Sequence, residues 1–72
     1  MARRPGPPTY GKRFVGNSSH MEVHDLDRET TACQIDEIIR ARHAVTFTPD
    51  TLAQAHLQGY DNCAYCIGSS TR

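Results

Sequence analysis

Two short segments near the start of the chain have the pattern expected of β-strands. In 13–15 an apolar pair is followed by Gly16 and Asn17, two residues that suit a tight turn. Apolar and polar residues alternate in 21–24, which predicts a second strand. We expect the two strands to pair as a hairpin. Residues 25–31 are polar and charged without periodicity, which predicts a loop.

A helix is predicted after this loop, over 34–42. Ile35, Ile38 and Ile39 fall at helical spacing there, so they would lie on one face and pack in the core. The compact apolar run at 44–47 is too short for a helix and suits a central strand.

A second helix has the clearest start signal in the chain. Thr48 is a good N-cap, Pro49 suits the first helical position, and Asp50 in the first turn would complement the helix dipole. Gly59 is placed to end the helix in a left-handed conformation. The residues expected to share one face are Leu52, Ala55 and His56.

The chain has 72 residues and forms one domain, which we expect to span 13–68. A domain of this size buries little apolar surface and usually needs a disulfide, a metal or a partner for stability. Three cysteines cannot all pair, and no secretory signal or apolar span is evident. We therefore expect a bound metal in a reducing cytoplasm and no membrane association.

Charge is distributed unevenly along the chain. The first dozen residues are rich in Pro and Gly and contain no acid, which predicts a disordered basic arm over 1–12. A disordered tail is expected over 69–72. Residues 14–71 carry three arginines against eight carboxylates, a net charge of −5, which is unfavourable for binding phosphate. Any weak nucleic-acid contact would come from the cations Arg3, Arg4, Lys12 and Arg13.

The run from Cys63 to Gly68 contains the strongest chemical signal. A Cys-x-x-Cys-x-Gly turn directs two thiolates at one point, which is half of a tetrahedral zinc site. Cys33 is the only other cysteine, and His24 precedes it by nine positions. Together with Cys66 these residues would complete a Cys3His shell around one zinc. A redox dithiol or unligated thiols are the alternatives at this motif.

Four histidines compete for the nitrogen position of this shell. His43 is expected where the first helix ends and His56 on a face of the second helix, and a lone histidine in such a place is more often a surface or packing residue than a ligand. His24 is preferred because it closes the second predicted strand, and His20 is the next candidate. A shell filled entirely by protein leaves no exchangeable water, so the site would be structural. No catalytic constellation is evident, and we expect no enzymatic activity.

Several of these residues together resemble the zinc-binding domain at the N-terminus of Ada-type alkylation-repair proteins, most closely the small versions fused to bacterial nucleases. The resemblance covers about 13–67 and rests on Phe14-Val15-Gly16-Asn17, His24, Cys33, Val45-Thr46-Phe47, Ala55, Gly59-Tyr60 and Cys63-Ala64-Tyr65-Cys66. It implies that His24, Cys33, Cys63 and Cys66 are the zinc ligands. It also implies a small α/β zinc-stabilised domain in which short strands and two helices surround the metal and its Cys-x-x-Cys knuckle.

The position of the first ligand separates this chain from the repair proteins. There a cysteine thiolate accepts a methyl group from a DNA phosphotriester, whereas here the position falls on His24, and a zinc-bound imidazole lacks that nucleophilicity. We therefore expect an accessory module that binds a protein partner. The alternatives are a nucleic-acid-binding module and a thiolate that accepts alkyl groups at Cys33, Cys63 or Cys66.

Overall fold

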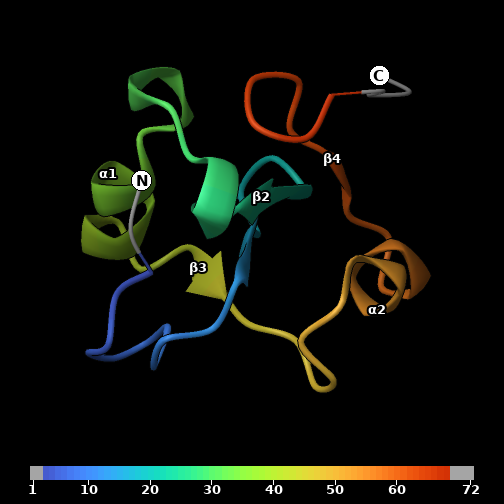
Figure 1. Ribbon diagram of the computed structural model, residues 1–72, viewed down its shortest axis with the longest axis horizontal. Helices are drawn as coiled ribbons and strands as arrows, with labels where there is room; N and C mark the ends of the chain where they lie inside the picture. The colour runs from blue at the N-terminus through green and yellow to red at the C-terminus, as the bar shows by residue number, and fades with distance from the viewer. Residues whose placement is uncertain (1–2, 69–72) are drawn as a thin grey trace.

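The computed structural model describes residues 3–68, and a four-stranded sheet lies at its centre (Figure 1). The strand order is β3-β1-β2-β4. Its strands are β1 (Phe14–Asn17), β2 (Glu22–Asp25), β3 (Ala44–Val45) and β4 (Asp61–Asn62). The pairs β1–β2 and β1–β3 are antiparallel, whereas β2–β4 is parallel. The helical elements are the 3-10 turns η1 (Leu26–Arg28) and η2 (Thr31–Cys33) and the helices α1 (Ile35–Arg40) and α2 (Leu52–Leu57). This arrangement confirms a small α/β fold.

Each face of the sheet has its own apolar cluster. Successive side chains of a strand point to opposite faces, so Phe14 and Val15 enter different clusters. The cluster on the α2 side comprises Phe14, Val23, Phe47 and Ala55. The cluster on the α1 side comprises Val15, Leu26, Cys33, Ile35, Ile38, Cys63 and Cys66. Because all three cysteines belong to the second cluster, the expected metal site is part of the core.

The predicted hairpin is present, but its turn lies later than expected. Gly16 and Asn17 belong to β1, and the chain turns at 18–21. A Cβ atom at Gly16 would lie 2.8 Å from side-chain atoms of Phe47, Tyr60 and Val45. The glycine therefore allows these side chains to approach the sheet, which is a packing role rather than a turn role.

The second helix begins at Leu52, not at Pro49 as the sequence predicts. Its N-cap is Thr51, whose side chain accepts a hydrogen bond from Gln54 N. Asp50 has a different role, since its carboxylate accepts hydrogen bonds from Arg13 N (2.7 Å) and Phe14 N (3.0 Å). The expected stop at Gly59 is confirmed, because that residue has a φ of 91° just beyond the helix.

Three other segments differ from expectation in extent or content. The first helix spans Ile35–Arg40, within the predicted range, and it buries Ile35 and Ile38 as expected. The run at 44–47 forms only the two-residue edge strand β3, whereas a central strand was predicted. The predicted loop at 25–31 contains η1 and the start of η2, and Leu26 within it is fully buried. A single apolar residue gives no periodicity, so the sequence pattern could not reveal this burial.

The segment predicted as a disordered arm packs against the body from residue 3 onward. The Thr9 side chain is fully buried and its hydroxyl donates to Arg4 O at 2.6 Å. Arg4 forms ion pairs with Glu29 (2.7 Å) and Asp36 (2.8 Å). These carboxylates come from later segments of the chain, so the composition of 3–12 gives no sign of the contacts. The tail expected at 69–72 lies outside the described residues. Within 3–68, no helix has the length and apolarity needed to cross a membrane.

Candidate metal centre

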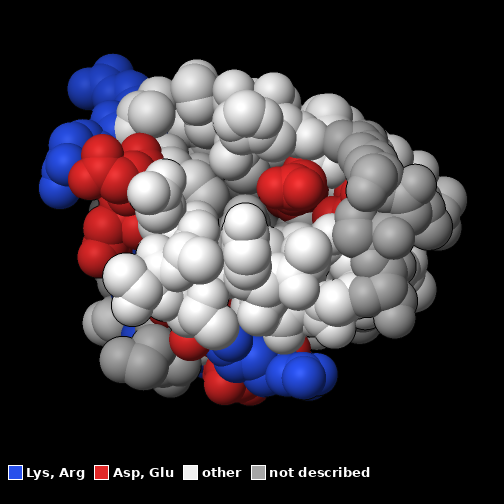
Figure 2. All heavy atoms as spheres, turned by 90° about the horizontal axis from the view of Figure 1, so that it is seen from above, with Lys and Arg blue, Asp and Glu red and all other residues white. Residues whose placement is uncertain are grey.

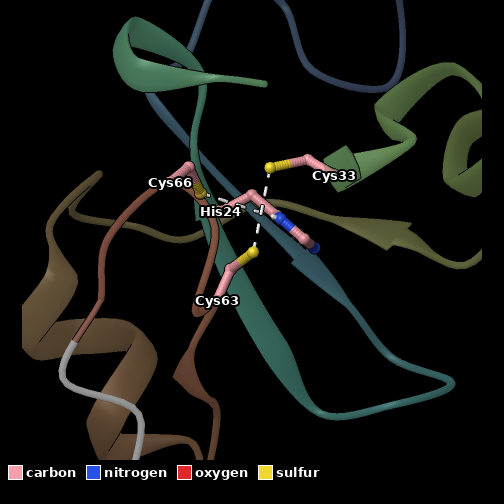
Figure 3. A group of neighbouring side chains, drawn as sticks. All are labelled: His24, Cys33, Cys63 and Cys66. Carbon is pink, nitrogen blue, oxygen red and sulfur yellow. Dashed lines mark hydrogen bonds between the residues drawn. The ribbon is translucent and has the colours of Figure 1, made fainter. Parts of the chain in front are cut away.

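The structure brings together all four residues that the sequence analysis selected as ligands (Figure 3). His24 comes from β2, Cys33 ends η2, Cys63 follows β4, and Cys66 lies in the next turn. Each is buried, with between 2% and 5% of its surface exposed. One ligand atom from each residue lies within 4.8 Å of all the others. Segments far apart in the sequence therefore meet at one point in the core.

The spacing of these atoms fits a tetrahedral metal ion. Two ligands at a typical Zn–S distance lie about 3.8 Å apart on a tetrahedron. The Sγ atoms of Cys33 and Cys63 are 3.8 Å apart, and Cys66 Sγ is 3.9 Å from His24 Nδ1. Figure 3 shows the sulfur atoms and this ring nitrogen converging on a shared centre. Three sulfurs and one imidazole nitrogen form a donor set that suits zinc.

Backbone hydrogen bonds shape the turn that carries two of the cysteines, which we call the knuckle (63–68). Cys63 N donates to Val23 O at 3.0 Å, which ties the knuckle to β2. The Cys63 carbonyl then accepts from Ile67 N (3.0 Å) and Gly68 N (2.9 Å). Gly68 has a φ of 82°, a conformation that glycine adopts without strain. This explains the glycine two positions after Cys66 in the motif.

Two contacts to the cysteine sulfurs were not foreseen from the sequence. Asp25 N donates to Cys66 Sγ at 3.3 Å, and Thr30 Oγ1 lies 3.6 Å from Cys33 Sγ. Contacts of this kind orient ligands and stabilise negative charge on sulfur. The first depends on a backbone group brought near Cys66 by the fold, so no motif could have indicated it. Thr30 could have been suspected only from its place three residues before Cys33.

Burial shifts the protonation of the site in a consistent direction. It raises the pKa of the Cys63 and Cys66 thiols and lowers the pKa of His24, because charge is poorly solvated there. Without a cation the Cys63 and Cys66 thiols therefore stay protonated and the imidazole stays neutral. Thiolates this close together in the core need a positive ion between them. Their protons would be released when the metal binds.

The other three histidines lie outside this cluster. His56 is exposed and its Nε2 makes a 2.6 Å hydrogen bond with Asn62 Oδ1. His43 is exposed, and its backbone carbonyl accepts from Ser18 N at 2.9 Å. His20, the second candidate from the sequence, is exposed in the hairpin turn. Of the four histidines, only His24 contributes to the group of potential ligands.

Comparisons with protein-family models, curated proteins and solved structures find no match to this chain. The resemblance to Ada-type domains therefore rests on the residues quoted above. The site itself rests on the geometry of its four side chains.

Proposed function

We propose that this chain is a structural zinc module that binds one zinc ion through His24, Cys33, Cys63 and Cys66. The observation that carries the proposal is the convergence of four buried ligand atoms within 4.8 Å. A shell filled by four protein ligands leaves no position for a reactive water, which is typical of structural zinc sites. Zinc binding would then contribute stability to the fold that the two small apolar clusters do not provide by themselves.

We further propose that the module serves as an accessory domain for a protein partner. Figure 2 shows the face that carries η2 and the knuckle, and most of its visible surface is uncharged. Lys and Arg lie at its edges, beside Asp or Glu, and a further group of Asp or Glu lies near its middle. Tyr65 in the knuckle is 68% exposed. Exposed aromatic residues on an uncharged surface are common at protein–protein interfaces.

The internal contacts of the N-terminal cations support this choice over nucleic acid. Arg3 pairs with Asp27 at 2.8 Å, and Arg4 pairs with Glu29 at 2.7 Å. The remaining two cations are also engaged: Arg13 pairs with Asp25 at 2.8 Å, and Lys12 Nζ donates to Phe47 O at 2.9 Å. A cation that already faces a carboxylate offers less attraction to phosphate.

The burial of the three sulfurs likewise weighs against the thiolate acceptor. Cys33, Cys63 and Cys66 are each at most 5% exposed. A reactive thiolate is usually accessible and has a lowered pKa, whereas burial raises the pKa of the Cys63 and Cys66 thiols here.

Native mass spectrometry of the full chain tests the metal binding, and we expect one zinc ion per chain.

Photo-crosslinking tests the binding of a protein partner. A photo-crosslinking residue replaces Tyr65 in one variant and, as a control on α2, Ala53 in another. We expect a discrete crosslinked product from position 65 only.

Titration of the full chain with duplex and single-stranded DNA at physiological salt tests the alternative function, nucleic-acid binding. Submicromolar binding there would favour the nucleic-acid module.

A further inference from the structure

A small polar cavity borders the candidate metal centre. Its volume is about 160 Å³, enough for a few water molecules, since each occupies about 30 Å³ in the liquid. Its lining includes the ligands His24, Cys33 and Cys63, together with Asn17, Glu22 and Tyr65. The candidate metal centre is therefore bordered on one side by a polar cavity and is not enclosed by apolar residues alone.

The hairpin places the polar lining residues on the same face as the metal ligand. Glu22 and His24 are two residues apart on β2, so their side chains leave the same face of the sheet. Asn17 on β1 lies directly opposite Glu22 in the antiparallel register. Side chains opposite each other in such a pair are about 5 Å apart at Cβ. The spacing of two residues therefore brings Glu22 close to His24, and the register brings Asn17 close to Glu22.

Two hydrogen-bonding groups of the lining residues have no hydrogen-bond partner among the described residues. The first is His24 Nε2, which is buried and makes no hydrogen bond. Nδ1 of the same ring is the nitrogen 3.9 Å from Cys66 Sγ, and Figure 3 shows the other nitrogen pointing away from that sulfur. When Nδ1 binds a metal, Nε2 must carry the ring proton, so it becomes a buried donor that needs an acceptor.

The second group is the carboxylate of Glu22, a half-buried residue that has no hydrogen bond or ion pair to the side chains of residues 3–68. Asn17, by contrast, already accepts a hydrogen bond from Ser19 N at 3.0 Å through its Oδ1. The lining also contains the potential acceptors His20, Gln34 and Tyr65, but Glu22 is its one carboxylate, and an ionised carboxylate is the strongest acceptor for the His24 proton. The two groups are complementary but are not hydrogen-bonded to each other.

We propose that the cavity is a binding site for a bridging water, which accepts from His24 Nε2–H and donates to the Glu22 carboxylate. This inference rests on the proposed zinc binding at Nδ1. It makes Glu22 a positioning residue of the metal centre, since it acts on the metal through the water and the imidazole. A carboxylate linked to a ligating histidine fixes its tautomer and orientation and increases its basicity.

The zinc dissociation constant of the full chain, measured by competition with a chelator, tests the role of Glu22. We expect Glu22→Ala to weaken zinc binding about tenfold, at the lower end of the effect typical of such outer partners. Glu22→Gln should weaken it less, because the amide oxygen can still accept from the water. The matched control is Glu37→Ala on α1, where the carboxylate pairs at the surface with Arg40, and it should leave the affinity unchanged.

Nitrogen-15 NMR of the zinc-loaded wild-type chain tests the geometry without any substitution. We expect His24 to carry its proton on Nε2 and to bind zinc through Nδ1, with cross-relaxation between the Nε2 proton and water. A proton on Nδ1, or equal affinities for Glu22→Ala and Glu37→Ala, would overturn the bridging water while leaving the zinc site intact. Failure of the wild type to bind zinc would instead overturn the proposed function, and this inference with it.

Discussion

The backbone N–H of Asp25 donates a hydrogen bond to the Sγ of Cys66 at 3.3 Å, although 41 positions separate the two residues. The Asp25 carboxylate is itself buried, and it accepts hydrogen bonds from Arg13 Nε (3.0 Å) and Nη2 (2.8 Å) and from Asp27 N (3.0 Å). These contacts hold the end of β2 in the position from which its backbone reaches the knuckle. Asp25 is therefore one of the residues that join the hairpin to the candidate metal centre, beside Val23, which accepts from Cys63 N, and His24.

Replacing Asp25 should consequently affect both stability and the metal. We expect Asp25→Ala to lower the free energy of unfolding by about 1–3 kcal/mol, because Asp27 N and the Arg13 side chain lose their acceptor. Chemical denaturation of the zinc-loaded protein measures this. Asp36→Ala is the control, since that side chain is 74% exposed and its pairing with Arg4 should contribute little. An equal loss in both variants would show that the Asp25 network is unimportant.

The ligand set makes a prediction about individual histidines. His24→Ala should weaken zinc binding far more than His20→Ala, His43→Ala or His56→Ala, because only the first removes a ligand. Cobalt substitution provides a second readout, since a tetrahedral site with three sulfurs and one nitrogen has a characteristic visible spectrum that His24→Ala should alter. Equal zinc affinity in all four variants would place the nitrogen ligand elsewhere.

Removal of the metal should unfold the domain. Its core consists of two small clusters, and one of them contains the three cysteines that would hold the metal. Zinc binding contributes about 10 to 16 kcal/mol in small zinc domains, more than the few kcal/mol that a core of this size supplies. Dispersed amide resonances should collapse on addition of a strong chelator and return with zinc. Retained dispersion after chelation would mean that the apolar clusters suffice.

Acid should release zinc and destabilise the fold. Burial holds the pKa of His24 below its ordinary value of 6.5, so the unfolded chain binds a proton below pH 6.5 that the folded chain does not. Stability then falls as the pH decreases, by up to about 1.4 kcal/mol per pH unit for this one proton. The cysteine ligands also take up protons when the metal is released, so the stability of the zinc-loaded protein should fall more steeply with decreasing pH. Zinc release monitored with a chromophoric chelator should show this, and His56→Ala should leave the profile unchanged.

Gly16 should tolerate no side chain. An added Cβ would lie 2.8 Å from Phe47, Tyr60 and Val45, all of which pack on the α2 face of the sheet. We expect Gly16→Ala to lower the free energy of unfolding by about 1–3 kcal/mol, the usual cost of overpacking. Gly6→Ala is the matched control, because no atom lies within 4 Å of the Cβ it would add. Thermal unfolding of the two zinc-loaded variants compares them, and equal midpoints would contradict the packing argument.

The sequence by itself predicted the features that depend on residues close together in the chain. The knuckle, the isoleucine face of α1 and the glycine stop after α2 each follow from spacings of a few residues, which backbone geometry fixes locally. The four candidate ligands were also selected from the sequence, because a tetrahedral zinc site requires four donors and the chain has only three cysteines, although His20 stayed a second choice for the nitrogen.

Tertiary structure alone decided the features whose partners are distant in the sequence. Asp50 has the local pattern of a helix start, yet its carboxylate binds the backbone of Arg13 and Phe14. Gly16 has the local pattern of a turn, yet the approach of Phe47 and Tyr60 keeps it within a strand. In both cases local propensity amounts to about 1 kcal/mol or less per residue. Several buried contacts made only in the complete fold outweigh it.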